Sequence, residues 1–281
     1  MSDHFPWVKG HGTRNDFLLL PDPDNGVHGD LDPALVRALC DRRGGLGADG
    51  VLRVVRSDAY DDAHAHAAAA AGAVWFMDYR NADGSLSEMC GNGIRVFARY
   101  LVHAGLVEEG QPVPIGTRDG VKTASFCPDG SIRIDMGGVR VLGTVEVGIG
   151  ARRWSALKVD VGNPHAVAMV DSLDDAGSLL EAPEHDTADF PEGVNVEFVV
   201  RTGERSVAMR VHERGSGETQ SCGTGVVAVA AAVASIDALD RPAELDVRVP
   251  GGDLMVRLRT DGGADLVGPA VLVAQGTWPL L

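Results

Sequence analysis

The chain has 281 residues, 44% of them hydrophobic and 23% charged, and its formal net charge is −15. A chain of this length can bury a sizeable core, as one large domain or as two of ordinary size. The acidic balance argues against nucleic acid or an anionic membrane as a partner, because both are bound through clustered Lys and Arg.

In chain order, residues 1–17 come first, and they lack the basic and then apolar pattern of a secretory signal peptide. No apolar run approaches the roughly 18 residues of a membrane-spanning helix. We therefore expect a cytoplasmic protein without a membrane segment. Its four cysteines are widely spread and form no CxxC pair, which predicts free thiols rather than a disulfide framework.

Short apolar runs, separated by Gly, Asp and Asn, follow one another along the chain and predict strands. The expected strands span 17–21, 51–55, 74–79, 131–136, 157–161, 165–170, 194–200, 206–211, 245–250 and 254–259. The run at 131–136 and the LDVRV run that begins at 245 alternate in polarity, as half-buried strands do.

Helical patterns are fewer. A helix is predicted over 32–42, with Asp32 as its cap and Pro33 at its first position. Cys40 lies on the apolar face of this helix and is expected in the core. The Ala- and His-rich segment 57–72 is expected to be a solvated loop or short helical insertion rather than a metal site.

The chain also contains a diverged internal repeat. EMCGNGIRVFARYL at 88–101 pairs with QSCGTGVVAVAAAV at 220–233, and each copy carries Cys-Gly-(Asn/Thr)-Gly before a helical stripe. The stripe consists of Ile94, Phe97, Ala98 and Leu101 in the first copy and Val226, Val229, Ala230 and Val233 in the second. Asn81 and Glu213 stand at the same distance before their Cys. A period of about 130 residues indicates a duplicated domain.

Cys90 and Cys222 are the residues on which this pattern places chemistry. A Cys at the first turn of a helix meets unpaired N–H groups and the positive end of the dipole, so we expect a stabilised thiolate. The same N–H groups can hold a carboxylate. If the two helix starts share a substrate, one sulfur accepts a proton and the other donates one, without a metal or pyridoxal phosphate. No ligand spacing supports a structural zinc site, and Cys127 is given no role.

Several segments, taken together and in this order, resemble diaminopimelate epimerase. They are HGTRNDF at 11–17, GLGADG at 45–50, NADGS at 81–85, the two Cys motifs, VGNPHAV at 161–167, VNVEF at 194–198 and ERGSGETQSCGTG at 213–225. The resemblance implies an α/β (α+β) fold of two pseudo-symmetric lobes, each a curved, mostly antiparallel sheet wrapped around a central helix. We expect residues 1–126 in the first lobe, with 270–281 returning to it, and 127–269 in the second.

The resemblance also implies roles for individual residues. Cys90 and Cys222 are the acid/base pair, and His165 and Glu213 lie close enough to bias the protonation of the sulfurs. The substrate-binding residues implied are Asn15, Asn81, Gly91, Asn92, Asn163, Asn195, Glu213, Arg214, Gly223 and Thr224. Taken alone, Asn15 or Asn81 could equally satisfy only its own turn.

The implied reaction is the interconversion of LL- and meso-2,6-diaminopimelate on the route to lysine and peptidoglycan precursors. The implied enzyme is a cofactor-free homodimer. Three other functions fit parts of the pattern: a proline or hydroxyproline racemase-like enzyme, a non-catalytic amino-acid-binding protein, and a redox thiol protein. The ERG segment and the several Asn side chains favour a long zwitterion over a compact ring. A binding protein would not need both sulfurs.

Overall fold

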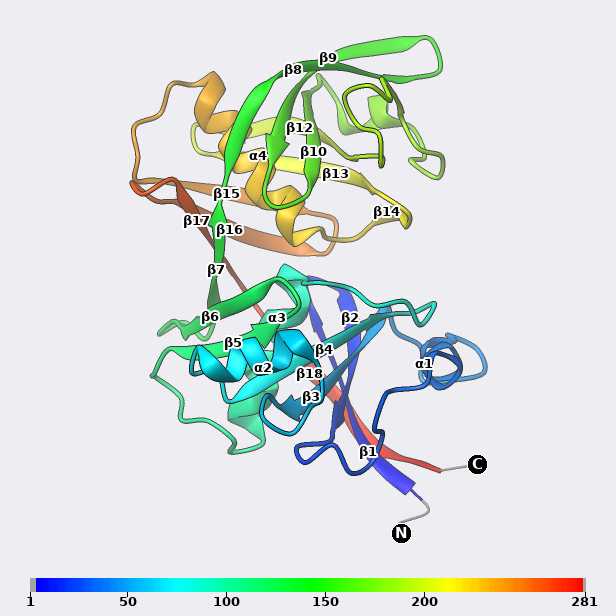
Figure 1. Ribbon diagram of the computed structural model, residues 1–281. Helices are drawn as coiled ribbons and strands as arrows, with labels where there is room; N and C mark the ends of the chain where they lie inside the picture. Colours follow the sequence, from blue (N-terminus) through cyan, green and yellow to red (C-terminus); the bar gives the residue numbers. More distant parts are fainter. Residues whose placement is uncertain (1–3, 280–281) are drawn as a thin grey trace. The chain divides into compact units, whose positions relative to one another are not determined.

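The computed structural model describes residues 4–279, in which strands predominate and four α-helices occur (Figure 1). The chain forms two compact units. The first unit contains the chain up to Ile134 and the stretch from Pro269 onward, and the second unit is Asp135–Gly268. Each helix within residues 4–279 is too short or too polar to cross a bilayer.

The first unit is a mixed sheet in the order β18-β1-β2-β3-β4-β5-β6-β7. Its strands are β1 His4–Gly12, β2 Asn15–Pro21, β3 Gly50–Arg56, β4 Trp75–Asn81, β5 Val113–Thr117, β6 Gly120–Phe126, β7 Ile132–Gly138 and β18 Val271–Pro279. The β2/β3 and β4/β5 pairs are parallel and the other neighbours are antiparallel. Parallel neighbours need a crossover, which the helices supply.

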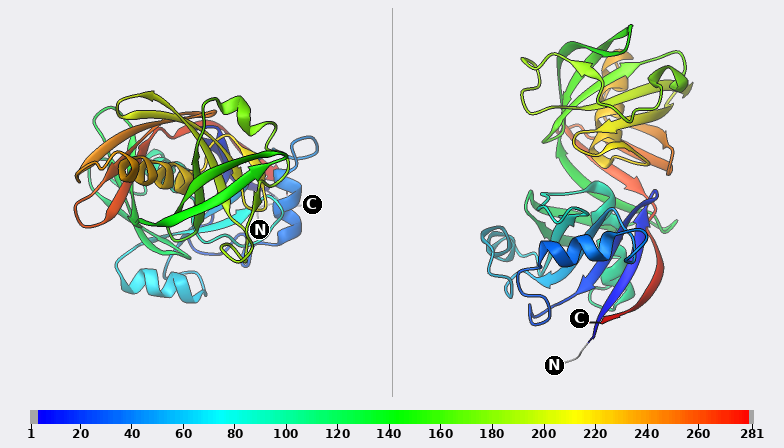
Figure 2. Two further views of the ribbon diagram at one scale, coloured as in Figure 1. Left: turned by 90° about the horizontal axis from the view of Figure 1, so that it is seen from above. Right: turned by 90° about the vertical axis from the view of Figure 1, so that its right-hand side faces the viewer.

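The helices of the first unit are α1 Pro33–Cys40, α2 Ala63–Ala70 and α3 Gly91–His103. Helix α1 connects β2 to β3, and α3 connects β4 to β5. The first eight residues of α3 are all buried, and the helix packs against β1, β2, β3, β6 and β18, so it is the central helix of this unit (Figure 2).

The second unit has the order β8-β9-β10-β12-β13-β15-β16-β17, with short β11 beside β8 and β14 beside β13. The strands are β8 Arg140–Ile149, β9 Arg152–Asp160, β10 Pro164–Met169, β11 Glu184–His185, β12 Asn195–Gly203, β13 Ser206–Glu213, β14 Gly217–Thr219, β15 Ala243–Val249, β16 Gly252–Leu258 and β17 Gly263–Gly268. Helix α4 Gly223–Ile236 is central here: eleven of its residues are buried, and it contacts strands on both sides of the parallel β13/β15 pair.

The two units repeat one plan of strand pairing. Along each eight-strand order, the neighbours are antiparallel, antiparallel, parallel, antiparallel, parallel, antiparallel and antiparallel. In each, the central helix is the crossover of the second parallel pair. Strand β4 ends at Asn81 and β13 ends at Glu213, the two positions that the repeat pairs. Positions in one unit therefore have defined counterparts in the other.

The ten expected strands are all present, with shifted ends, and the expected helix is α1, capped by the side chain of Asp32. Strands β7 and β15 show the expected alternation of burial. Segment 57–72 contains α2, which Asp62 caps. The division between the units falls inside β7, after Ile134, whereas the sequence placed it at 126. Residues 127–134 stay with the first unit because β7 pairs with β6.

A buried ion network supports the first unit. Asp78 on β4 accepts from Arg53 Nε at 2.9 Å, Arg80 Nε at 3.1 Å and Arg118 Nη2 at 2.5 Å. Burial raises the pKa of Asp78, but the three guanidinium groups outweigh it and hold that pKa below its ordinary value. Arg118 also donates to the carbonyls of Tyr79 and Ser87, which ties β4 to the segment before Cys90.

Candidate active site

Cys90 is the N-cap of α3. Its extended backbone (φ −138°, ψ 122°) precedes the helix, and its half-buried sulfur accepts from the Gly93 amide at 3.4 Å. The sulfur also lies 3.5 Å from Asn15 Oδ1. The helix start therefore presents the sulfur beside its unpaired amides, as the sequence predicts.

Asn15 is held in one orientation. Its Nδ2 donates to Asp49 Oδ2 at 2.8 Å, and Arg42 fixes the other oxygen of Asp49 at 2.7 Å. The Asn15 Oδ1 is thereby turned toward Cys90 and accepts from Asn92 Nδ2 at 3.3 Å. Asn15, Asn92 and Cys90 therefore lie together, and Asp49 orients the side chain of Asn15.

A buried cation lies one turn into α3. Arg95 is fully buried and donates to neutral acceptors, at 2.9 Å to the Gly91 carbonyl and 2.8 Å to Asn92 Oδ1. Burial lowers the pKa of Arg95 to about 10, and the nearby Cys90 acts in the opposite direction. Among the ion pairs of residues 4–279, none joins Arg95 to a carboxylate. This guanidinium is a fixed positive charge near the Cys90 sulfur.

Cys222 is the N-cap of α4 and is buried. Its sulfur lies 3.6 Å from Thr224 Oγ1. The expectation of a stabilised thiolate is wrong for this residue: burial raises the pKa of the Cys222 thiol well above its ordinary value, and Glu213 and Glu197 raise it further. The helix-end effect is smaller than the combined cost of desolvation and two adjacent carboxylates.

His165 and Glu197 form a buried pair beside α4. His165 Nδ1 lies 2.6 Å from Glu197 Oε1, and both side chains are fully buried. His165 Nε2 lies 3.0 Å from Asn163 Oδ1, and Asn163 Nδ2 donates to Thr224 Oγ1 at 3.3 Å. A continuous path of polar contacts thus connects Glu197 with the start of α4.

Glu213 ends β13 and accepts from the Thr219 hydroxyl. Burial raises the pKa of this carboxyl, and Glu197 raises it further, whereas hydrogen bonds from Thr219 and Cys222 act in the opposite direction. Glu213 and Thr224 therefore lie beside Cys222, and Asn163 and His165 follow Thr224 in a chain of polar contacts. Their roles toward a substrate remain predictions.

Comparison with known proteins shows the family of this chain. A family model described as diaminopimelate epimerase matches residues 7–142 and 157–273. The chain belongs to the diaminopimelate epimerase family. A diaminopimelate epimerase of Streptomyces coelicolor is 56% identical over 283 residues, which cover 98% of this chain and 96% of that protein. A diaminopimelate epimerase of Thermobifida fusca is 50% identical over 271 residues, covering 96% of each.

The fold is shared beyond the diaminopimelate epimerases. A hydroxyproline epimerase from Agrobacterium vitis superposes with a TM-score of 0.70 at 16% identity, over 99% of this chain and 93% of that one. A phenazine biosynthesis protein of the PhzF family from Bacillus anthracis gives the same TM-score and identity, over 99% of each chain. These likenesses establish the two-lobed α/β fold.

The remaining residues expected of a diaminopimelate epimerase have defined local partners in the two units. Gly91 and Gly223 are the first residues of their helices. Asn81 donates to Ser85 Oγ at 3.0 Å within its own turn. Asn195 bridges two main-chain groups, donating to the Pro164 carbonyl and accepting from the Arg214 amide, each at 3.0 Å.

Arg214 extends toward Glu192: its Nη1 lies 3.3 Å from the Glu192 carbonyl, and its side chain is 41% exposed. Its guanidinium therefore remains accessible to a ligand carboxylate. Cys40 is buried, and burial raises its pKa to about 12, in line with a core role. Within residues 4–279, no cluster of three or more His, Cys, Asp or Glu side chains is placed to hold a metal ion.

Glu197 is the residue that sequence reasoning missed. It lies in VNVEF, a segment cited for the family resemblance, but only Asn195 was drawn from it. The signal available was an acidic residue in the middle of an apolar strand, since Glu197 falls between Val196 and Phe198 and all three are buried. A buried charge in such a place requires a partner or a function.

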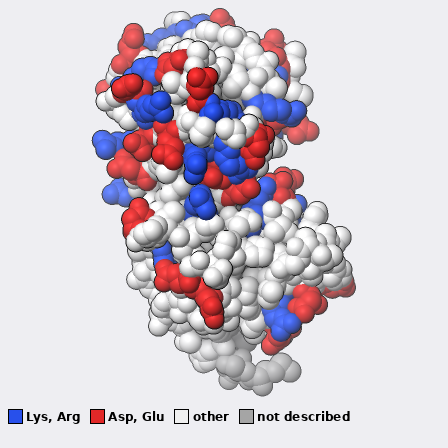
Figure 3. Space-filling model, turned by 90° about the vertical axis from the view of Figure 1, so that its left-hand side faces the viewer, with Lys and Arg blue, Asp and Glu red and all other residues white. Residues whose placement is uncertain are grey.

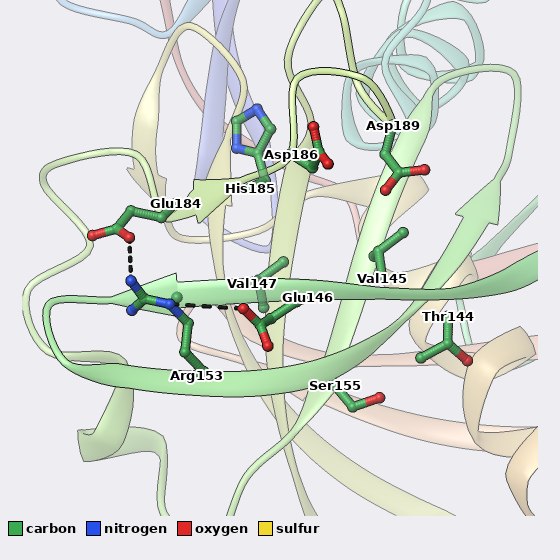
Figure 4. A pocket seen from close by; sticks show the side chains of 11 residues that line it. Thr144, Val145, Glu146, Val147, Arg153, Ser155, Glu184, His185, Asp186 and Asp189 are labelled. Atoms are coloured by element: carbon green, nitrogen blue, oxygen red, sulfur yellow. Dashed lines mark hydrogen bonds and ion pairs between the residues drawn. The ribbon is translucent and has the colours of Figure 1, made fainter.

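A separate hollow of ≈ 620 Å³ occurs in the second unit, lined by β8, β9 and the 184–189 segment (Figure 4). Glu184, His185, Asp186 and Asp189 surround it, and Arg153 ion-pairs with Glu184. None of the residues expected at the diaminopimelate epimerase site lines this hollow.

Acidic and basic side chains are interspersed on the face drawn in Figure 3 and form no continuous basic patch there.

Proposed function

We propose that this chain interconverts LL- and meso-2,6-diaminopimelate, with Cys90 and Cys222 as its two acid/base residues. The observation that carries the proposal is the duplication. Two units with one pairing plan each end an equivalent strand at a polar residue and begin an equivalent helix directly after a Cys. Two equivalent sulfurs are what a proton transfer between the two faces of one carbon requires.

In the proposed reaction, the Cys90 thiolate takes the α-proton from one face of the substrate. The C–H electron pair stays on the α-carbon and spreads onto the carboxylate, which the amides at the starts of α3 and α4 stabilise. The Cys222 thiol then delivers its proton to the opposite face. The product has the inverted centre, Cys90 is a thiol and Cys222 a thiolate, and exchange of protons between the two sulfurs and water restores the pair for the next substrate.

The environment of Cys222 supports its role as the acid in this direction. A buried thiol with two carboxylates beside it holds its proton until a strong acceptor is generated. The carbanion is such an acceptor. Since the two sulfurs share one proton, their titration belongs to the pair.

Substrate contacts are part of the proposal. Arg214, Asn15 and Asn163 can serve a zwitterion, because a guanidinium binds a carboxylate with two parallel hydrogen bonds and an amide both donates and accepts. These side chains can bind the second amino-acid end of diaminopimelate, which a compact ring substrate lacks. We further propose that the protein is a cytoplasmic homodimer, which cell fractionation and light scattering with size-exclusion chromatography would test.

The deciding experiment incubates purified protein with LL-diaminopimelate in D₂O without added cofactor. The meso isomer should appear with deuterium at the inverted α-carbon. Cys90→Ser and Cys222→Ser should each reduce the rate by at least about a hundredfold, since each removes one general acid/base group, while Cys127→Ser should match the parent. Retention of the original hydrogen, or full activity in either Ser variant, would refute the two-base scheme.

A further inference from the structure

The carboxylate of Glu197 lies against the start of α4, where packing of the fold does not require a charged group. A Cβ placed on Gly225 would lie 2.7 Å from Glu197 Oε1 and 3.3 Å from Cys222 Sγ, so the carboxylate and the sulfur flank the same glycine. Glu197 is fully buried, and its Oε2 finds no hydrogen-bond partner among the described residues. Orphaned buried acidic oxygens are costly and call for an explanation.

The first unit shows that the fold itself does not require this group. In the β2/β3 ladder Phe17 pairs with Gly50, and in the equivalent β10/β12 ladder His165 pairs with Asn195. Two residues further along the second strand stand Leu52 and Glu197. The buried His–Glu pair of one unit thus takes the place of an apolar Phe–Leu pair in the other.

The neighbours of the two glycines confirm the equivalence. A Cβ on Gly93, the third residue after Cys90, would meet Phe17 at 3.4 Å and Leu52 at 3.5 Å. At Gly225 the corresponding neighbour is Glu197. An apolar pair fills this place without loss of the fold, so the charged pair of the second unit serves Cys222 rather than packing.

We propose that Glu197 is a positioning residue that keeps the proton on Cys222 in the free protein, with His165 as the partner that holds its carboxylate in place. The inference deepens the proposed function, because it assigns what keeps one sulfur of the pair ready to donate. The ionisable groups that act on Cys222 are Glu213 from β13 and Glu197 from β12, and the Thr224 hydroxyl of α4 lies 3.6 Å from its sulfur. His165 from β10 faces Glu197 at 2.6 Å.

The result expected follows from the charge that is removed. Burial raises the pKa of the Glu197 carboxyl, and the charge and hydrogen bond of His165 oppose that rise and favour its ionised form. Glu197→Gln keeps the shape of the side chain and a hydrogen bond to His165, but it removes the charge of that ionised form beside the sulfur. The Cys222 thiolate should then form more readily, because a like charge close by disfavours ionisation. Glu197→Leu, which copies the residue of the first unit, should act in the same direction.

The experiment measures how fast methyl methanethiosulfonate modifies Cys222 in the free protein at pH 8, followed by mass spectrometry of its peptide. In Glu197→Gln and Glu197→Leu the rate should rise about tenfold, which is one pKa unit. Glu218→Gln removes a carboxylate that pairs with Arg210 on the same unit and should leave the rate unchanged. A urea transition near that of the parent confirms that each variant is folded.

Epimerisation supplies the second measurement. With Glu197 replaced, kcat/KM should shift its dependence on pH toward lower pH. An unchanged or slower Cys222 modification in both folded variants would overturn the proposal and leave Glu197 as a packing residue. Because the modification assay needs no diaminopimelate, it can succeed even if the proposed reaction is wrong, and activity without a change in thiol reactivity would reject the role of Glu197 alone.

Discussion

Replacing the second glycine of each Cys motif, Gly93 or Gly225, by alanine should give opposite results in the two units. A Cβ on Gly93 meets its nearest neighbours at 3.4–3.5 Å, which is ordinary contact. A Cβ on Gly225 would lie 2.7 Å from Glu197 Oε1, closer than the two atoms can approach. Gly93→Ala is therefore the matched control for Gly225→Ala.

The expected change in the free energy of unfolding depends on which contacts the added methyl group displaces. Ala in place of Gly within a helix stabilises by about 0.5–1 kcal/mol, and this gain is available at both positions. At Gly225 the carboxylate must withdraw from its 2.6 Å contact with His165, and hydrogen bonds to charged groups contribute about 1.5–3 kcal/mol. We expect Gly93→Ala to be neutral or slightly stabilising and Gly225→Ala to cost about 1–2 kcal/mol.

Urea unfolding followed by circular dichroism measures the difference, which should lie near 2 kcal/mol between the two variants. Gly225→Ala should also speed the modification of Cys222, because it displaces the Glu197 carboxylate without changing that residue. Equal stability of the two alanine variants would show that Glu197 is free to move. The view that His165 holds it against Cys222 would then fail.

Three further changes test other parts of the molecule. Asp78→Asn removes the carboxylate shared by three buried guanidinium groups and should cost about 3–5 kcal/mol at pH 7 by urea unfolding. Asp58→Asn, at an exposed pair with Arg56, should leave the urea midpoint close to that of the parent. Because the pKa of Asp78 is lowered in the folded protein, its stabilisation is present above its ordinary pKa and is lost as the pH falls through the folded value, so the Asp78→Asn deficit should shrink in acid. Arg95→Met removes the guanidinium hydrogen bonds to the Gly91 carbonyl and Asn92 Oδ1 and should cost about 2–4 kcal/mol and most of the epimerase activity, and a stable, active variant would contradict this. Arg214→Lys should raise KM for diaminopimelate about tenfold with little change in kcat, since an ammonium cannot replace a two-point guanidinium contact, and an unchanged KM would remove Arg214 from the site.

Local features of the sequence predicted the positions of both sulfurs. The Cys-Gly-x-Gly spacing and the apolar stripe that follows it are patterns of neighbouring residues, and each copy of the motif marks the start of one helix. The strands that went unpredicted have weaker patterns. Strand β8, for example, has only Val147 and Gly148 buried, although it pairs with β9 over most of its length.

The properties of Cys222 could not be predicted in this way. Helix-start reasoning uses the amides and dipole of one helix, and from these alone both sulfurs should favour the thiolate. The pKa of Cys222 is raised instead by burial, by Glu213 and by Glu197, which stands 25 positions earlier in the sequence. The register of β10 against β12 places the Glu197 carboxylate near His165. Only the paired strands bring these groups to one helix end.

The buried charges around the two sulfurs differ in a direction that suits the reaction. The first unit has the fixed cation Arg95 and the apolar pair Phe17 and Leu52, and the second has two carboxylates at the corresponding helix start. Two equal sites would give each sulfur the same affinity for the one proton they share, and half of the free protein would carry it on either side. A carboxylate at one site alone removes this degeneracy. Duplication supplied two equivalent helix starts. The difference between their buried pairs, Phe–Leu in one unit and His–Glu in the other, adds to burial and Glu213 in keeping the proton on Cys222.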